Sequence, residues 1–131
     1  MVFQWRSGLV ISDVEKRAYH VGDQLASPLN LTLKPGNSIK SDASVMIGLF
    51  DSNNGVLASK FLTIQDFIEQ TGDNVVPVET NGVYFYESPG EYIVPSDKFM
   101  NYTFNQKGKY ELYFVILDLD IKQKTTIEVQ Q

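Results

Sequence analysis

Two stretches of this chain have the composition of β-strands but are apolar on both of their alternating faces. They are Val45–Phe50, which reads Val-Met-Ile-Gly-Leu-Phe, and Tyr110–Leu117, which reads Tyr-Glu-Leu-Tyr-Phe-Val-Ile-Leu. Successive side chains of a strand point to opposite sides of its sheet, so a strand with one buried face alternates apolar and polar residues. The second face of these strands must therefore be covered by another part of the chain, by a second copy or by a partner.

Composition limits the class of protein. The 131 residues have the length of one ordinary domain, and no linker, repeat or low-complexity tract divides 1–131. The formal net charge is -5 and Lys and Arg are not clustered, which argues against a nucleic-acid partner. The absence of cysteine excludes disulfides, thiolate nucleophiles and Cys-ligated metals.

We expect neither a signal peptide nor a membrane-spanning segment in this sequence. The sequence shows no signal peptide, and no apolar run approaches the roughly 20 residues that cross a bilayer, so we expect no membrane insertion. The lack of cysteine does not determine the cellular compartment, because a cytosolic protein, a virion protein or a processed cell-surface protein can each lack cysteine.

Turn residues recur at short intervals between β-rich runs, which predicts an all-β antiparallel sandwich of about seven to nine strands. Asn54-Gly55 and Asn81-Gly82 predict hairpins with type I′ turns, since both residues of that turn need positive φ. The strands are expected at Leu9–Arg17, Leu25–Leu33, Val45–Asp51, Gly55–Leu62, Val75–Val78, Gly82–Glu87, Phe99–Phe104, Tyr110–Asp118 and Ile121–Val129.

One short helix is predicted at Ile64–Gln70, inside a segment (63–96) that is longer than a sandwich connection requires. Thr63 can cap its N-terminus, with Asp66 three residues later, and Gly72 can occupy a left-handed position beyond its end. Ile64, Phe67 and Ile68 fall on one helical face, so we expect this face to pack against a sheet.

Gly108-Lys109-Tyr110 opens the strand that continues as Glu111-Leu112-Tyr113-Phe114-Val115. This motif resembles the corner tyrosine that begins the sixth strand of immunoglobulin-like and fibronectin-like sandwiches. The run Ala18–Leu25, with its Tyr-x-x-Gly-Asp pattern, followed by Phe50-Asp51 and Asn54-Gly55, is similar to macroglobulin-like, filamin-like and bacterial surface modules. The resemblance implies an immunoglobulin-like fold but no particular function. The chain lacks the paired cysteines and intervening tryptophan of antibody domains.

The sequence offers little material for catalysis, so we expect a protein that is not an enzyme and has no cofactor. The one histidine, His20, is expected in a turn. Two carboxylate pairs, Glu87 with Glu91 and Asp118 with Asp120, flank predicted turns, where acidic residues are common. Asp51–Gly55 lacks the spacing of a calcium loop, so no metal site is predicted.

If the sandwich interpretation holds, Val45–Phe50 and Tyr110–Leu117 are strands C and F, neighbours in one sheet. The resemblance to a corner tyrosine implies that Tyr110 faces inward, and alternation then places Leu112, Phe114 and Ile116 in the core with it. Val45, Ile47 and Leu49 are assigned to the core because β-branched residues pack well there. The outer face would carry the candidate binding residues Met46, Phe50, Tyr113, Val115 and Leu117. Tyr84 and Tyr86 form a second, weaker candidate.

Two readings of the outer face remain open at this stage. The segment 63–96 could fold over it through Ile64, Phe67 and Ile68 or through the two tyrosines, or the face could be an intermolecular interface. Three alternative functions are considered. The first is a protein-interaction or assembly module, with a homodimer as one form. The second is a carbohydrate-binding module that uses Tyr84, Tyr86, Tyr92 and Trp5, and the third is an acidic inhibitor that inserts the Glu79–Glu91 hairpin into an enzyme.

Overall fold

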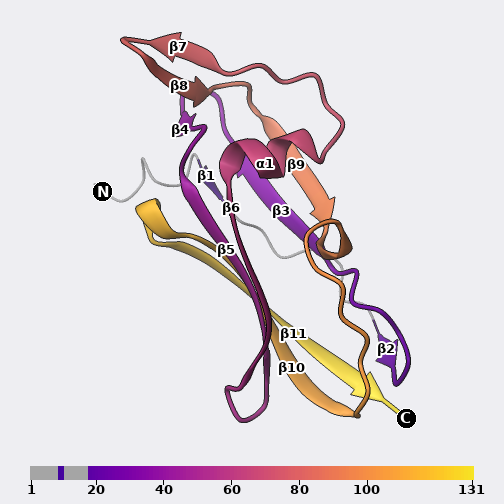
Figure 1. Cartoon of the computed structure of the whole chain (residues 1–131). Helices are drawn as coiled ribbons and strands as arrows, with labels where there is room; N and C mark the ends of the chain where they lie inside the picture. Colours follow the sequence, from indigo (N-terminus) through magenta and orange to yellow (C-terminus); the bar gives the residue numbers. More distant parts are fainter. Residues whose placement is uncertain (1–8, 11–17) are drawn as a thin grey trace.

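The computed structural model describes residues 9–10 and 18–131 and shows an all-β sandwich with one short α-helix (Figure 1). Its elements, in chain order, are β1 (Leu9–Val10), β2 (Tyr19–His20), β3 (Pro28–Leu33), β4 (Ile39–Lys40), β5 (Ser44–Asp51), β6 (Val56–Thr63), α1 (Ile64–Glu69), β7 (Val78–Thr80), β8 (Val83–Tyr86), β9 (Gly90–Pro95), the 3-10 turn η2 (Ser96–Lys98), β10 (Gly108–Ile116), the 3-10 turn η3 (Leu117–Leu119) and β11 (Ile121–Gln130).

Two sheets enclose the core. The larger has the order β2-β11-β10-β5-β6 and the smaller the order β1-β3-β9. Leucines on β3 and alternating residues on β5 and β10 belong to the same buried cluster, which places the core between the two sheets. All of these pairings are antiparallel except that of β2 with β11, where Tyr19 lies beside Val129 in a parallel bridge. This parallel pair was not predicted.

The two strands with two apolar faces are neighbours, as the sequence predicted. β10 pairs with β5 over seven register positions, from Tyr110 opposite Asp51 to Ile116 opposite Val45. The residues predicted to face the core are all buried: Val45, Ile47, Leu49, Tyr110, Leu112, Phe114 and Ile116. The predicted parity of both strands is therefore confirmed.

The helix α1 packs on the inner side of this sheet. Thr63 and Asp66 form the predicted capping box, with each side chain accepting a hydrogen bond from the other residue's backbone N–H. The Phe67 ring stacks on Phe114 of β10 at 4.9 Å between ring centroids and on Phe99 at 5.8 Å. Because Phe114 points into the core, the helix closes the sandwich interior and leaves the outer face of β5 and β10 free.

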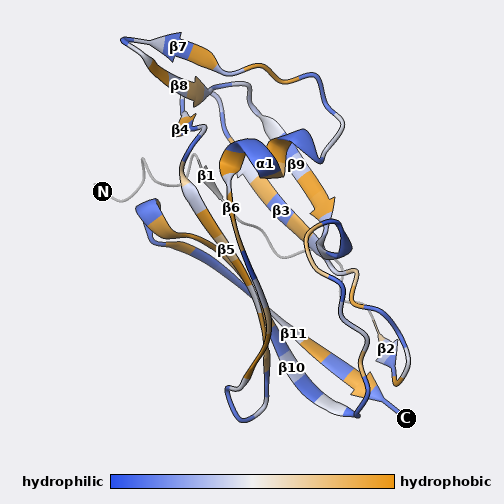
Figure 2. Ribbon diagram, viewed as in Figure 1, coloured by the Kyte–Doolittle hydropathy of each residue, from blue (hydrophilic) through white to orange (hydrophobic). Residues whose placement is uncertain are grey.

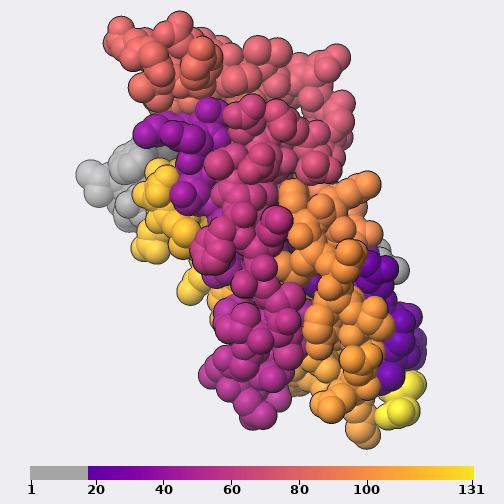
Figure 3. Space-filling view, viewed as in Figure 1, coloured from indigo at the N-terminus to yellow at the C-terminus, as the bar shows by residue number. Residues whose placement is uncertain are grey.

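A third, three-stranded sheet of order β4-β8-β7 extends from the body. Figures 1 and 3 show β7 and β8 projecting at one end of the molecule, away from the loop that joins β5 and β6. Asn81 and Gly82 join the two strands with φ of 53° and 84°, which confirms the predicted type I′ turn.

The second predicted type I′ turn is wrong. Asn54 has φ of 63°, but Gly55 does not have positive φ. The Asp51 carboxylate accepts hydrogen bonds from the N–H groups of Asn53 and Gly55, so it organises a longer loop in which Asn54 alone takes the left-handed conformation.

Two strands also differ from the prediction. Phe99–Phe104 forms no strand and has one isolated bridge, from Thr103 to Gln24. Gly90–Pro95, which was not predicted as a strand, forms β9 beside β3. Strands β1 to β11 also exceed the expected number, because β2, β4 and β9 were not anticipated. The strand expected at Val75–Val78 is displaced along the chain and forms β7, which shares only Val78 with the prediction. Most of the strand expected at Leu9–Arg17 lies outside the described residues.

Two tyrosines anchor the starts of strands in the same way. The Tyr110 hydroxyl donates to the Gln106 carbonyl at 2.5 Å, and the Tyr92 hydroxyl donates to the Ser88 carbonyl at 2.5 Å. Each tyrosine stands two residues after a glycine at the first position of its strand, β10 and β9. A tyrosine that bonds to the backbone a few residues upstream is the contact made by a corner tyrosine.

Candidate functional site

The outer face of the large sheet consists of three cross-strand rows. The register gives Lys122–Val115–Met46–Phe61, Lys124–Tyr113–Gly48–Ser59 and Thr126–Glu111–Phe50–Val56, each read from β11 through β10 and β5 to β6. Side chains that are directly opposite in antiparallel strands share a face and interact. Apolar residues thus occupy the middle and the β6 side of the face, and lysines occupy the β11 side.

Gly48 is the centre of this face. Its cross-strand partner is Tyr113, and the Tyr113 ring contacts Phe50 edge-on at 5.3 Å between centroids. A Cβ at position 48 would lie 2.9 Å from Phe50 Cε1 and 3.1 Å from Met46 Sδ. The two side chains therefore lean over the glycine, and a larger residue at this position would push them away.

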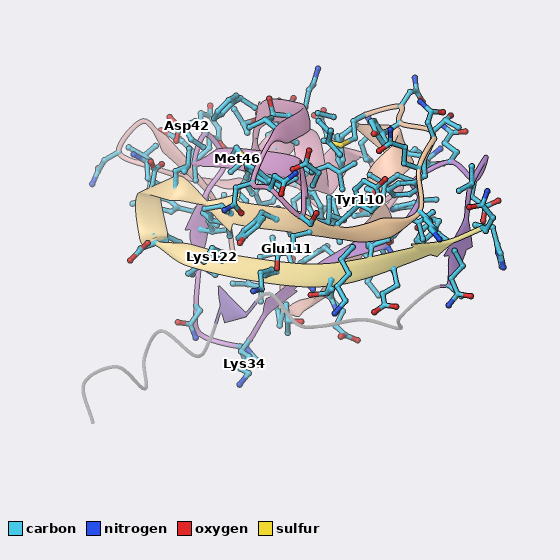
Figure 4. All side chains as sticks on the ribbon, turned by 90° about the horizontal axis from the view of Figure 1, so that it is seen from below. Lys34, Asp42, Met46, Tyr110, Glu111 and Lys122 are labelled. Carbon is cyan, nitrogen blue, oxygen red and sulfur yellow. The ribbon has the colours of Figure 1, made fainter. Side chains whose placement is uncertain are left out.

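An open groove of about 370 Å³ lies on the face, lined by Met46, Phe50, Asn54, Tyr113, Val115 and Lys122. The Lys122 Nζ stands 5.7 Å from the centroid of the Tyr113 ring, close enough for a cation–π contact. Figure 4, seen from below, shows Glu111 and Lys122 at the neighbouring β10 and β11 ribbons and Met46 on β5 beside them. The groove therefore joins an apolar floor to a cationic rim.

The rest of the rim is polar. Lys124 Nζ lies 3.2 Å from Glu111 Oε2, and the Tyr113 hydroxyl donates to Glu111 Oε1 at 3.2 Å. Glu111 therefore fixes both the tyrosine and one lysine. Lys122 has no carboxylate oxygen within 4.0 Å among the described residues.

The predicted outer residues separate into two groups in the structure. Met46, Phe50, Tyr113 and Val115 come together around the groove, and all four are partly exposed. Leu117 is 46% exposed but lies in η3, beyond the end of β10, where the chain turns toward β11. It therefore does not line the groove.

Segment 63–96 does not cover this face. Ile64, Phe67 and Ile68 are buried in the core, and so is Tyr86, which is 1% exposed. Tyr86 pairs with Ile39 of β4, so it cannot serve as the binding residue that the sequence suggested. Tyr84 is 52% exposed on the projecting hairpin.

Two outer-face residues were missed by sequence reasoning. Phe61 and Val56 are 67% and 62% exposed, and they lie on β6 opposite Met46 and Phe50. Continuing the alternation from one strand to its hairpin partner could have identified Phe61. Val56 could not be assigned in this way because a register shift at Leu49 and Phe50 changes the parity of β6.

The aromatic residues proposed for sugar binding do not form a platform. Of the three tyrosines considered for sugar binding, Tyr86 and Tyr92 are buried and Tyr84 is exposed. Trp5 lies outside the described residues. Exposed rings in a common plane are what such a platform requires, so this arrangement does not favour the carbohydrate hypothesis.

Three of the titratable groups singled out in the sequence have structural contacts. His20 Nδ1 lies 4.0 Å from Asp23 at an exposed turn, Asp118 accepts a hydrogen bond from the Ser44 N–H, and Glu91 accepts one from the Asn30 amide. Burial raises the pKa of Tyr86, Tyr92 and Tyr110 above the usual 10.0. Smaller increases in the same direction come from Glu69 and Asp66 at Tyr86, from Asp73 at Tyr92, and from Tyr102 and Asp51 at Tyr110. Within residues 9–10 and 18–131, no three His, Cys, Asp or Glu side chains cluster as metal ligands would.

No family model matches the sequence, and no curated protein matches it significantly. Among the described residues, no helix has both the length and the apolar composition needed to cross a membrane.

Proposed function

We propose that this domain is a non-enzymatic protein-interaction module and that it binds through the outer face of β5, β10 and β6. The observation that carries the proposal is the groove around Met46, Phe50, Tyr113 and Val115, which no other described part of the chain covers. Met and aromatic residues are enriched at protein interfaces, and a contiguous apolar patch of this kind commonly marks a contact surface.

The apolar groove is smaller than the area that a stable protein interface buries. The groove and the neighbouring β6 residues supply a patch on the order of a few hundred Å². A standard-size stable interface buries roughly 800 Å² per partner. The partner must therefore reach beyond the groove, and the exposed Phe61 and Val56 provide the nearest additional apolar surface.

The proposal includes an immunoglobulin-like identity for the sandwich. The order β2-β11-β10-β5-β6 supports it, because β5 and β10 then correspond to strands C and F, with β11 as G. The pairing of β3 with β9 corresponds to strands B and E, and the Tyr110 contact fits a corner tyrosine at the start of F. The third sheet would be an insertion before strand E.

Site-specific photo-crosslinking tests the proposed surface. A benzoyl-phenylalanine at position 61, which is exposed on the proposed face, is compared with the same residue at position 93, since Ile93 is 47% exposed on β9 of the other sheet. Both proteins are irradiated alone and in an extract of the source organism. We expect a discrete adduct from position 61, either a covalent dimer or one other protein, and none from position 93.

The matched variant Val115→Glu should remove that adduct, because it places a charge in the groove. Its folding is checked by circular dichroism and thermal unfolding. Equal adducts from both positions, or an adduct from position 61 that persists with Val115→Glu in a folded protein, would contradict the proposal.

The projecting hairpin of β7 and β8 favours a second candidate, an acidic inhibitor that inserts this hairpin into an enzyme cleft. The candidate rests on the exposed Tyr84 and on the turn at Asn81-Gly82. A panel of hydrolases assayed with the intact chain and with Tyr84→Ala tests it. Inhibition that is weakened by the substitution would support it, and absence of inhibition across the panel would count against it.

A further inference from the structure

Met46 brings the only sulfur atom to the groove on the outer face. The sequence has no cysteine and three methionines, so its sulfur chemistry is that of the thioether. Two of the methionines, Met46 and Met100, lie among the described residues. A thioether that takes up one oxygen atom from a peroxide becomes a sulfoxide, and an apolar side chain thereby becomes a polar one. The surroundings of the two sulfur atoms differ in a way that directs this reaction.

The Met46 sulfur lies on the outer side of β5, above the backbone of Gly48. A Cβ at position 48 would be 3.1 Å from Met46 Sδ and 2.9 Å from Phe50 Cε1, so the sulfur and the ring edge lie side by side where a larger residue would place its own side chain. Met46 is partly exposed and lines the open groove of about 370 Å³. A peroxide molecule is far smaller than this groove, so an oxidant in solution can reach the sulfur.

Met100 is in the opposite situation. It is 9% exposed and belongs to the hydrophobic core, and its N–H donates to the Ser96 carbonyl at 3.1 Å, which holds it beside η2. Oxidation at this position would place a polar sulfoxide among apolar side chains, which is unfavourable in a core. Mild oxidation should therefore modify Met46 first and leave the fold intact.

A sulfoxide at Met46 changes the middle of the apolar face. The cross-strand partners of Met46 are Val115 on β10 and Phe61 on β6, and Figure 2 shows further hydrophobic residues along β5. The neighbouring Phe50 ring contacts Tyr113 edge-on at 5.3 Å between centroids, so Met46 adjoins the aromatic pair of the groove. Thioether sulfur makes favourable contacts with aromatic rings, whereas a sulfoxide oxygen requires water or a hydrogen-bond donor. Any contact that buries this part of the face is therefore weaker after oxidation.

We propose that Met46 is a reversible oxidation site that regulates binding at the outer face. This inference rests on the proposed function of that face and names a means of controlling it. The S–O bond forms as the O–O bond of hydrogen peroxide breaks, the sulfur loses two electrons to the peroxide, and water is released. A methionine sulfoxide reductase reverses the step, because the oxygen leaves as water while a dithiol is oxidised to a disulfide. The reduced chain binds its partner, and the oxidised chain binds it weakly.

Peptide mapping by mass spectrometry tests the selectivity of the reaction. The full chain is treated with dilute hydrogen peroxide, and sulfoxide formation at Met46 and Met100 is followed over time, with N-acetylmethionine amide as the reference compound. We expect Met46 to react within about threefold of the reference rate and Met100 at least about tenfold more slowly. In concentrated urea both should react at the reference rate. Equal rates in the folded chain, or a faster reaction at Met100, would overturn the inference.

Photo-crosslinking tests the effect on binding. The benzoyl-phenylalanine is placed at position 56, because Val56 is 62% exposed on the same face but lies opposite Phe50 rather than Met46. The protein is used reduced, oxidised at Met46 with the peroxide removed, and oxidised and then treated with methionine sulfoxide reductases and dithiothreitol. We expect oxidation to reduce the adduct by about fivefold or more and the reductases to restore it.

Two variants at the same position complete the test. Met46→Leu conserves the side-chain volume but has no sulfur, so its adduct should be the same before and after peroxide treatment. Met46→Gln places a polar group in the groove permanently and should behave like the oxidised wild type. Circular dichroism and thermal unfolding check that each variant, and the oxidised wild type, remains folded.

Failure of this inference is distinguishable from failure of the proposed function. An adduct that persists when Met46 is fully oxidised, or one that peroxide removes equally from Met46→Leu, would overturn regulation by Met46 while the face would still stand as an interface. No adduct from the reduced protein at positions 56 and 61 would overturn both proposals. Selective oxidation of Met46, with an adduct that is lost and then restored, supports the inference.

Discussion

Tyr113 of β10 is the direct cross-strand partner of Gly48 on β5, at the centre of the outer face. The glycine leaves space on this face into which Met46 and Phe50 lean, since a Cβ there would lie within 3.1 Å of both side chains. The absence of one side chain therefore shapes the groove that lies between the apolar middle of the sheet and the lysines of β11.

Gly48→Ala should change the groove with little effect on folding. The added methyl group meets the ends of two flexible side chains rather than backbone, and alanine in a strand gains roughly 0.5–1 kcal/mol over glycine in conformational entropy. We expect the free energy of unfolding, measured in urea, to stay within about 1 kcal/mol of the wild type. Any association through the face should weaken. A loss of stability well above that figure would show that the backbone around position 48 cannot adjust.

Tyr110→Phe should destabilise the fold by about 1 kcal/mol, because the Gln106 carbonyl loses its hydrogen bond while the ring is retained. Tyr92→Phe should behave similarly through Ser88. Urea unfolding at neutral pH measures both. The control is Tyr84→Phe on the projecting β7–β8 hairpin, where the side chain is exposed, and it should change stability by less than about 0.5 kcal/mol. A Tyr110→Phe protein as stable as the control would contradict an anchoring role for the hydroxyl.

Stability should fall as the pH rises above about 10, the pKa of an unfolded-state tyrosine. Burial raises the folded-state pKa of Tyr86, Tyr92 and Tyr110, so over this range the unfolded chain releases protons that the folded chain retains. The unfolded state then binds fewer protons, and the free energy of unfolding decreases with pH. Below pH 10 the stabilisation that comes from these three protonated tyrosines is fully present.

The double variant Tyr92→Phe/Tyr110→Phe isolates this effect. It starts from a lower stability at pH 7, because two hydrogen bonds are lost, but its decrease between neutral and alkaline pH should be smaller than that of the wild type. Urea unfolding at a series of pH values gives, for each protein, the slope of the free energy of unfolding against pH. Parallel slopes for the two proteins would mean that these tyrosines do not govern the alkaline loss.

Phe67→Ala should cost about 3–5 kcal/mol, the usual range for removing a buried aromatic ring. Phe67 is fully buried and stacks on both Phe114 and Phe99. Phe61→Ala is the matched control, because the same residue type six positions earlier is 67% exposed on the outer face. We expect the control to unfold within about 1 kcal/mol of the wild type. Similar losses for both would contradict the assignment of inner and outer faces.

Several features of the fold could be read from residue pattern. Alternation separated the two faces of β5 and β10, and the corner-tyrosine resemblance together with the β-branched residues indicated which face is inward. Thr63 with Asp66 located the start of α1, since helix capping depends on neighbouring residues alone. The type I′ turn at Asn81-Gly82 is equally local. The same dipeptide pattern failed at Asn54-Gly55, because the Asp51 carboxylate stabilises a different loop there.

The candidate site shows the limit of such reasoning. The sequence by itself determined which residues alternate together, Tyr113 with Val115 on one strand and Met46 with Phe50 on the other, because successive side chains of a strand point to opposite sides. The resemblance of Tyr110 to an inward corner tyrosine and the β-branched residues of β5 then predicted that these four would share the outer face. It could not determine whether Ile64, Phe67 and Ile68 would cover that face, since an amphipathic helix has the same pattern whichever surface it meets. The tertiary structure decided this by stacking Phe67 on Phe114 inside the sandwich, and it buried Tyr86 while leaving the groove open.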